Sequence, residues 1–380
     1  MDCQKHLFQL DPQVHYLNCA YMAPMLKSVE ELGIEGIRKK RDPFKITADD
    51  FFRDSESVRK EFASLIGSNE SQRVALIPGT SYGMAIVANN ISLEPGEEVI
   101  VMEGQFPSNF YIWDRLAKQF GAKVITLSEP SEFPRGEAWN AAILGSINDR
   151  TRVVAMPHVH WADGTRFDLI SIRKKCNEHN TLLIIDGTQS VGALPFYVDE
   201  IRPDALICSG YKWLMGPYSM GMAWFGDKLI DGKPLEENWI NRKNSENFKE
   251  LVNYQAEYQP GALRYDVGER SNFILLPMML EALRQINEWG VENIYDYCSK
   301  LSGTAITELR EMGYELETGT YLSHHLFGVR RRGFDPVLFS EKLNDAKIYV
   351  SVRGNAVRVA VNVFNDQRDM EALLEVCRSI

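Results

Sequence analysis

Short apolar runs alternate with amphipathic stretches from about residue 49 to residue 225, and this alternation constrains the fold more than any other feature of the sequence. Short apolar runs are typical of buried parallel strands, whereas apolar residues at helical spacing, as in residues 108–120 and 168–179, are typical of helices that cover a sheet. A strand, its crossover and the next parallel strand connect right-handedly. The pattern therefore predicts an α/β domain with a mostly parallel sheet and helices on both faces. The predicted strands are VALIP, EEVIVME, KVITL, RVVAMPHV, TLLIID and DALICSG.

The pattern of apolar residues changes in the last third of the chain. Longer amphipathic stretches occupy residues 276–289 and 294–312, and two later runs, HHLFGVR and NAVRVAVNVF, predict short strands. With 380 residues the chain exceeds what one compact core holds. We therefore expect a large domain over residues 46–270 and a smaller α+β domain over residues 271–380. The segment of residues 1–45, with its extended HYLNCAYMAPM, is expected to join the smaller domain or to lie across the cleft.

Composition argues against several classes of protein. The chain carries 52 acidic and 42 basic side chains, and the net charge of −10 disfavours binding to nucleic acid. The dense basic run at residues 330–332 is expected to be a solvated turn. Six scattered cysteines, without a CxxC or Cys/His cluster, predict no metal site and no disulfide scaffold and favour the reducing cytoplasm. No leader and no apolar run of about 20 residues is seen, so we expect neither secretion nor membrane insertion.

The stretch PGTSYGM follows the first predicted strand and precedes an apolar helix. Gly79, Thr80 and Ser81 would offer backbone N–H groups and hydroxyls at that helix N-terminus, an arrangement that favours a phosphate group. The same residues are common in turns and helix caps. Both interpretations stay open for this motif alone.

Asp186 ends the apolar run TLLIID. A carboxylate at the end of a buried strand needs a cationic or hydrogen-bonding partner, and a protonated pyridine nitrogen would serve. A helix N-cap is the alternative, and it is equally plausible for this residue by itself.

Lys212 follows another apolar run, in the stretch SGYKWLMGP, between Tyr211 and Trp213. A desolvated lysine with a lowered pKa is a nucleophile toward an aldehyde, whereas an ordinary lysine is a surface charge. Asp186 and Lys212 are 26 residues apart, which leaves room for one helix and one strand. We therefore expect both side chains, and the phosphate turn, at the same edge of neighbouring strands.

These residues resemble the class V aminotransferase family, within fold type I of the pyridoxal 5'-phosphate enzymes. That family includes cysteine desulfurase, kynureninase and isopenicillin N epimerase relatives. The resemblance extends over most of the chain, through YLNCAYMAP, PGTSYGM, EGQFPSN, HVHWADGTRFDL, IIDGTQSVGALPF, CSGYKWLMGP, RYDVGERSN and AVRVAVNVFN.

The resemblance implies that Lys212 forms a Schiff base with pyridoxal 5'-phosphate and moves the α-proton of the substrate. It implies that Asp186 pairs with the pyridine nitrogen, so that the ring acts as an electron sink. Gln189 is expected to donate to the phenolic oxygen of the cofactor. Phe106, in EGQFPSN, matches the residue that stacks on the ring, with core packing as its alternative role.

For the cofactor phosphate, the resemblance implies contacts from Gly79, Thr80 and Ser81, with Ser209 and Tyr211 as further candidates. The Gly-Thr pair with which the family contacts the phosphate of the partner subunit reads Gly268-Glu269 here. An acid would repel a phosphate. Arg270 or Ser271 would then make that contact, or this turn points elsewhere.

For the substrate, the resemblance implies that Arg358 binds the carboxylate through two hydrogen bonds. An outward charge on an alternating strand is the competing interpretation. Asn18 and His160 are further expected substrate contacts, although His160, like His158 and Trp161, would equally serve as a wall of the cofactor site. The stretch YVSVRGNAVRVA contains no cysteine where desulfurases carry one, so a persulfide mechanism on that loop is not expected.

We expect an enzyme that acts at the α-carbon of a small amino acid, as an aminotransferase or a C–S or C–C lyase. An epimerase or racemase is the alternative. A nucleotide-binding oxidoreductase is disfavoured because no GxGxxG follows the first strands. A non-catalytic cofactor-binding protein is disfavoured by the presence of Lys212, Asp186 and Arg358. The resemblance also implies a homodimer.

Overall fold

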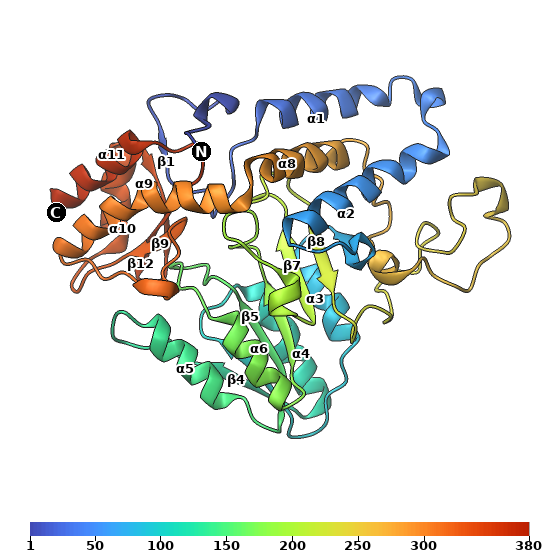
Figure 1. Cartoon of the computed structure of the whole chain (residues 1–380), viewed down its shortest axis with the longest axis horizontal. Coiled ribbons are helices and arrows are strands. Elements are labelled where there is room, and N and C mark those ends of the chain that lie inside the picture. Colours follow the sequence, from blue (N-terminus) through green and yellow to red (C-terminus); the bar gives the residue numbers. More distant parts are fainter. Residues whose placement is uncertain (380) are drawn as a thin grey trace.

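A seven-stranded sheet, in the order β2-β8-β7-β6-β5-β3-β4, forms the centre of the computed structural model, which describes residues 1–379 (Figure 1). Strand β8 is antiparallel to its neighbours β2 and β7, and the other strands are parallel to one another. The six predicted strands are all present, and β8 is a strand that the apolar pattern did not predict. The strands are β2 (Val74–Ile77), β3 (Glu98–Met102), β4 (Lys123–Leu127), β5 (Thr151–Pro157), β6 (Leu182–Asp186), β7 (Ala205–Ser209) and β8 (Gly221–Phe225).

Helices cover both faces of this sheet, because successive side chains of each buried strand point to opposite sides. In β5, Val153 and Ala155 belong to one core cluster with Trp113 of α4, whereas Val154 and Met156 belong to another. The structure therefore confirms the predicted α/β class. The helices up to β8 are α1 (Lys27–Lys39), α2 (Arg53–Leu65), α3 (Thr80–Asn89), α4 (Tyr111–Phe120), α5 (Gly136–Ser146), α6 (Leu169–Glu178) and α7 (Val198–Ile201).

A smaller set of elements lies to one side of the sheet, in orange and red in Figure 1. Its three-stranded antiparallel sheet has the order β11-β12-β9, and β1 (His15–Tyr16) of the N-terminal segment pairs in parallel with β10. Helix α8 (Leu275–Trp289) instead packs on α1 and α2. The remaining elements are α9 (Val291–Glu311), β9 (Leu326–Val329), α10 (Pro336–Asp345), β10 (Ile348–Tyr349), β11 (Ser351–Arg353), β12 (Ala356–Ala360) and α11 (Gln367–Arg378).

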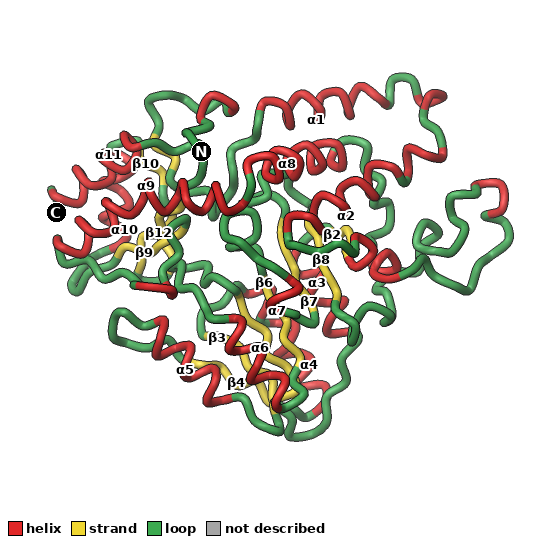
Figure 2. The backbone as a smooth tube through the Cα atoms, in the orientation of Figure 1, coloured by secondary structure: helices red, strands yellow, loops and turns green. Residues whose placement is uncertain are grey.

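The segment between β8 and α8 is mostly irregular and extends from the side of the molecule (Figure 2). Among the described residues, none of the helices combines the length and the apolar composition that crossing a membrane requires.

The turn that joins β7 to β8, residues 210–220, carries Lys212. The backbone N–H of Gly210 donates to the carbonyl of Met220 at 2.8 Å, and that of Gly216 donates to Gly210 at 2.9 Å. A Cβ atom on Gly216 would lie 2.3 Å from the sulfur of Met279, and one on Gly210 would lie 2.7 Å from the oxygen of Met220. Close packing of this turn therefore requires glycine at both positions.

The expectation of a solvated turn at residues 330–332 is wrong for Arg330. Its side chain is buried and forms ion pairs with Asp163 at 3.3 Å and Glu129 at 3.5 Å. Arg135 is also buried and pairs with Asp163 and Glu129. The backbone of Arg330 forms a bridge with that of Glu315, two residues before Glu317. We call Arg135, Asp163, Glu129, Glu317 and Arg330 the buried ion network.

Candidate active site

A small cavity lies at the carboxyl ends of β5, β6 and β7, beside the N-terminus of α3. Ligands bind at this edge in open α/β sheets because loops and helix N-termini gather there. The cavity brings together most of the residues that the sequence singled out. Its lining residues are Thr80, Phe106, Pro157, Val159, Trp161, Asp186, Thr188, Gln189, Ser209, Tyr211 and Lys212.

Lys212 is buried, with its Nζ 5.4 Å from the centre of the Phe106 ring and 5.5 Å from that of Tyr211. Burial and the positive charges of Arg358 and Arg353 lower the pKa of Lys212 to about 8, against the opposing charge of Asp186. Because loss of a proton frees the amine lone pair, Lys212 is a better nucleophile near neutral pH than a solvated lysine.

Asp186 is buried at the end of β6, and its Oδ1 accepts a hydrogen bond from the backbone N–H of Thr188 at 3.0 Å. Burial raises the pKa of Asp186, while the hydrogen bonds from Thr188 and the charge of Lys212 act in the other direction. In the described part of the chain it has no ion-pair partner. A buried carboxylate in this position is suited to a cationic nitrogen of a ligand.

Three hydroxyl side chains meet at the start of α3. The Oγ1 of Thr80 lies 2.7 Å from Oγ of Ser209 and 3.3 Å from Oγ1 of Thr188. These donors and the positive end of the helix dipole favour an anion such as phosphate. Ser81 is exposed and does not line the cavity. Tyr211 does line it, and its ring lies 4.6 Å from the ring of Tyr218. Gly79 is the residue before the helix.

Gln189 contacts protein groups through both ends of its amide. Its Nε2 donates to the carbonyl of Ala20 at 3.2 Å, and its Oε1 accepts from the indole N–H of Trp213 at 2.9 Å. One amide hydrogen remains for a ligand, because Nε2 carries two. The amide is therefore fixed in direction by the N-terminal segment and by the neighbour of Lys212.

Arg358 is buried on β12, with an exposed fraction of 1%, so the interpretation as an outward charge is wrong. Its Nη1 donates to the carbonyl of Trp161 at 2.8 Å, but Nε and Nη2 are buried without a hydrogen-bond partner. Burial and the charge of Arg353 lower its pKa to about 9. Asn18 accepts from Ser351 at 2.9 Å and donates to Val350 at 3.2 Å, so it secures the strand opposite Arg358.

His160, an expected substrate contact, lies outside the lining of this cavity. Its ring nitrogens face the carbonyl of Glu103 at 3.1 Å and the carboxylate of Asp163 at 3.4 Å. Its neighbour Trp161 lines the cavity instead, and the Trp161 indole donates to Gly104 at 2.6 Å. The histidine belongs to the wall behind Trp161.

The turn at Gly268-Glu269 leaves the expected phosphate contact without a donor from this chain. Glu269 is exposed with a φ of 57°. Arg270 is buried against Asp266 at 3.1 Å, and the Ser271 hydroxyl donates to Phe51 at 2.5 Å. Both alternative donors are therefore directed into their own subunit.

The donor set of the cavity fits pyridoxal 5'-phosphate. An unpaired buried carboxylate, a lysine with a lowered pKa and clustered hydroxyls at a helix N-terminus match the ring nitrogen, aldehyde and phosphate. Arg358 lies outside the lining, bonded to the carbonyl of Trp161, and its free N–H groups match a substrate carboxylate. The cavity is narrow, with a free volume of about 20 Å³, and Phe106 and Trp161 are among the side chains that line it.

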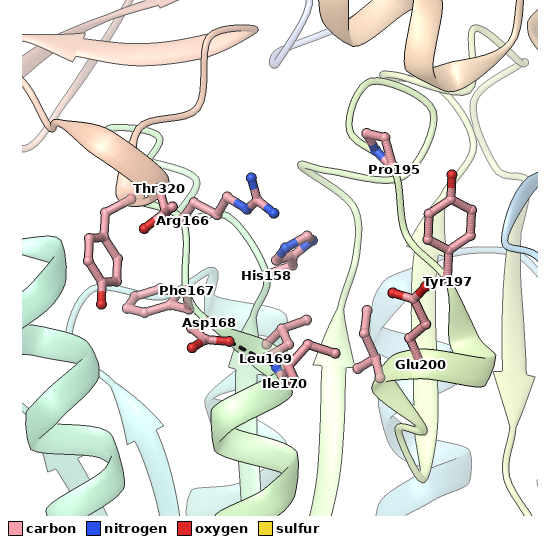
Figure 3. Close-up of a pocket in the computed structure, with 12 residues that line it drawn as sticks. His158, Arg166, Phe167, Asp168, Leu169, Ile170, Pro195, Tyr197, Glu200 and Thr320 are labelled. Carbon is pink, nitrogen blue, oxygen red and sulfur yellow. Dashed lines mark hydrogen bonds between the residues drawn. The ribbon is translucent and has the colours of Figure 1, made fainter.

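A larger hollow, of about 440 Å³, lies elsewhere, beside the start of α6 (Figure 3). Arg166, His158 and Pro195 border it, together with Tyr197 and Thr320. Burial lowers the pKa of His158 well below its ordinary value, so this imidazole is neutral. Its lining includes no lysine and no residue of the cavity around Lys212. We therefore place the chemistry in the smaller cavity.

Arg353 is a candidate that the sequence motifs did not single out. Its guanidinium carbon lies 5.4 Å from the centre of the Trp161 ring. The guanidinium carbon of Arg358 lies 6.0 Å from the same ring centre. The signal was present in RGNAVR, where a Gly-Asn turn predicts a hairpin and thereby brings both arginines together.

The model of a family described as Aminotransferase class-V matches residues 45–378. An uncharacterized aminotransferase, YcbU, of Bacillus subtilis is 24% identical over 323 residues, which cover 84% of this chain and 82% of that protein. A cysteine desulfurase of Escherichia coli is 24% identical over 262 residues, which cover 68% of this chain and 62% of the desulfurase.

Solved structures share the fold. An apo cysteine desulfurase from Thermococcus onnurineus has a TM-score of 0.85 at 19% identity, covering 100% of this chain and 98% of that one. The cystine C-S lyase C-DES, in a complex with cysteine persulfide, has a TM-score of 0.85 at 18% identity, covering 96% and 98%. A C-DES variant with glycine covalently linked to the PLP cofactor has a TM-score of 0.87 at 17% identity, covering 98% and 99%.

Proposed function

Because this chain belongs to the class V aminotransferase family of pyridoxal 5'-phosphate enzymes, we propose that it acts through Lys212 at the α-carbon of a small amino acid. The observation that carries the proposal is the pairing of Lys212 and Asp186 in one cavity, on the ends of neighbouring strands. We propose an aminotransferase or a C–S or C–C lyase, with an epimerase or racemase as the alternative.

Pyridoxal 5'-phosphate supplies an electron-withdrawing ring that stabilises negative charge at the α-carbon of a bound amino acid. Asp186 would hold positive charge on the ring nitrogen, because a buried carboxylate stabilises an adjacent cation. Lys212 would bind the aldehyde and then hold the α-proton on Nζ. Thr80 and Ser209 would bind the phosphate, and Phe106 would cover the ring.

Arg358 would orient the substrate through its α-carboxylate. The free Nε and Nη2 atoms form the side of the guanidinium that binds a carboxylate with two parallel hydrogen bonds. Its third nitrogen is fixed on Trp161. This bond would keep the guanidinium from rotating and so set which α-carbon bond faces the ring.

A cysteine nucleophile is not part of this proposal. The β11–β12 turn contains only Gly354 and Asn355 between the strands. Cys19 is fully buried, and burial raises the pKa of its thiol to about 12. The pKa of the Cys208 thiol is likewise raised by burial. Cleavage of a C–S bond would therefore proceed without a thiolate of this chain.

We also propose a homodimer, as the family resemblance implies. The exposed apolar side chains of Phe44, Val252 and Tyr254 support it, because large apolar groups in contact with water favour association. The inward direction of Arg270 and Ser271 is consistent with a phosphate site completed by other groups.

An absorbance experiment tests the function. Purified protein with pyridoxal 5'-phosphate should show a near-ultraviolet or visible band that survives gel filtration and changes when a substrate amino acid is added. After reduction with borohydride the wild type should keep the cofactor through denaturation, Lys212→Ala should release it, and the exposed control Lys233→Ala should keep it. Keto acid, ammonia or an inverted amino acid would then identify the reaction. Covalent retention of the cofactor by reduced Lys212→Ala, or release of a nicotinamide instead, contradicts the proposal.

A further inference from the structure

Arg353 and Arg358 lie on one face of the hairpin formed by β11 and β12. In its register Ser351 pairs with Arg358, and Arg353 pairs with Ala356. Side chains two residues apart on a strand point to the same side, so Arg353 shares the face of Ser351 and is the diagonal neighbour of Arg358. Diagonal neighbours are about 7–8 Å apart at the backbone, which is within reach of long side chains.

Both guanidinium groups converge on Trp161, which lines the cavity with Lys212. Their central carbons lie 5.4 Å (Arg353) and 6.0 Å (Arg358) from the centre of its ring. Electrostatics agree with this placement, because both arginines lower the pKa of Lys212. Two arginines therefore lie next to Trp161, just outside the residues that line the cavity.

Neither arginine has an acidic partner in the described part of the chain. The Nε of Arg353 is buried without a hydrogen-bond partner, and its Nη1 contacts only the carbonyl of the adjacent Val352, at 2.7 Å. Arg358 has two such unpartnered atoms. Two like charges held together and partly desolvated cost free energy unless anions neutralise them.

One carboxylate does not satisfy both groups. The α-carboxylate of an amino acid fills the two-pronged face of one guanidinium, which we assign to Arg358. The cofactor phosphate is matched by Thr80 and Ser209 at the start of α3. Arg353 is left with free hydrogen-bond donors and an uncompensated charge.

We propose that Arg353 binds a second anionic group, on the side chain of the amino acid substrate, so that the substrate class is amino acids with two acidic groups. This inference rests on the proposed function, because it takes Arg358 as the site of the α-carboxylate. Arg353 is then a specificity-determining residue, and the distance between the two guanidinium groups selects the length of the substrate.

Calorimetric titration of the holoenzyme tests the inference with unreactive probes. Succinate carries two carboxylates and butyrate one, and neither has an amino group that could react with the cofactor. We expect the wild type to bind succinate at least 10-fold more tightly than butyrate. Arg353→Gln should reduce this ratio to near 1, and Arg353→Lys should restore part of it. The control Arg332→Gln, at an exposed position in the smaller set of elements, should keep the wild-type ratio.

Amino acids of equal size provide the second readout. In spectral titrations of the cofactor, L-aspartate and L-glutamate should perturb the band at lower concentrations than L-asparagine and L-glutamine. Equal ratios for succinate and butyrate in wild type and Arg353→Gln overturn the inference. If the cofactor band responds to neutral amino acids alone, the proposed function holds and this inference fails. If no band forms on Lys212, the proposed function itself fails.

Discussion

Two pairs of arginines differ in what surrounds them. In the buried ion network, Arg135 and Arg330 share the carboxylate of Asp163, and the backbone N–H of Arg135 donates to Glu317. In the β11–β12 hairpin, Arg353 and Arg358 have no acid beside them in the described chain. Both groups lie where the smaller set of elements meets the main sheet. The first group stabilises the junction, whereas we propose that the second binds a ligand.

The difference teaches how to separate structural charge from functional charge. Although burial alone would raise it, the hydrogen bond from His160 and the charges of Arg135 and Arg330 hold the pKa of Asp163 well below its ordinary value. Burial and the charge of Arg353 instead lower the pKa of Arg358 to about 9, with no carboxylate among the groups that oppose them. A buried charge without a partner indicates that its partner arrives from outside the chain.

The largest effect should come from removing the shared acid. Asp163→Asn leaves Arg135 and Arg330 buried without their common partner and should reduce the free energy of unfolding by about 3 kcal/mol or more. Arg358→Gln removes a cation that has no acid and should leave this quantity unchanged or raise it. Urea denaturation of cofactor-free protein measures both. Equal destabilisation by the two substitutions would break the comparison.

A second contrast concerns catalysis. Arg358→Gln removes the two free donors that face the α-carboxylate, and with charged hydrogen bonds of about 1.5 kcal/mol each the expected loss in kcat/KM is about 100-fold. Arg330→Gln, in the paired network, should change stability more than kcat/KM. Steady-state kinetics at a temperature where both variants are folded provide the measurement. A loss in Arg330→Gln as large as that in Arg358→Gln would contradict the distinction.

The smallest effect is a shift in pH dependence. Only the neutral amine of Lys212 attacks an aldehyde, so the rate of cofactor attachment to cofactor-free protein should rise with pH and level off above about 8. Removing a neighbouring positive charge raises the pKa of a lysine, so Arg358→Gln should move the midpoint to higher pH. The charge of Asp163 is not among those that shift the pKa of Lys212, so Asp163→Asn should leave the midpoint in place. Stopped-flow absorbance across pH 6 to 10 follows the rate, and an unshifted midpoint in Arg358→Gln would refute the electrostatic link.

The site residues at the carboxyl ends of the strands were predictable from sequence because their positions depend only on the order of strands and helices along the chain. Asp186 and Lys212 each follow an apolar strand, and parallel strands end at one edge, so their proximity needs no side-chain detail. Thr80 was predictable for the same reason. Strand β8 was missed although GMAWF is a short apolar run like the others, and nothing in the run marks its reversed direction.

The residues that surround the site depend on contacts between distant parts of the chain. Arg330 pairs with Asp163, 167 residues earlier, so the run of three arginines could not reveal which one is buried. His160 and Trp161 are adjacent, yet only the tryptophan lines the cavity, because the direction of each side chain follows the local turn. The unpaired state of Arg353 is a property of its surroundings and has no signature in residue type.

The reversed direction of β8 has a consequence for how the family can diversify. The loops after β5 and β6 lead onward, but the turn that carries Lys212 returns at once to the same sheet and is closed by the bonds of Gly210 and Gly216. Added atoms at Gly210 or Gly216 would meet Met220 and Met279, whereas a Cβ atom on Gly354, at the tip of the β11–β12 hairpin, would meet no atom within 4 Å. New substrates are therefore expected to evolve by lengthening the hairpin, with the reactive amine kept as a fixed reference point.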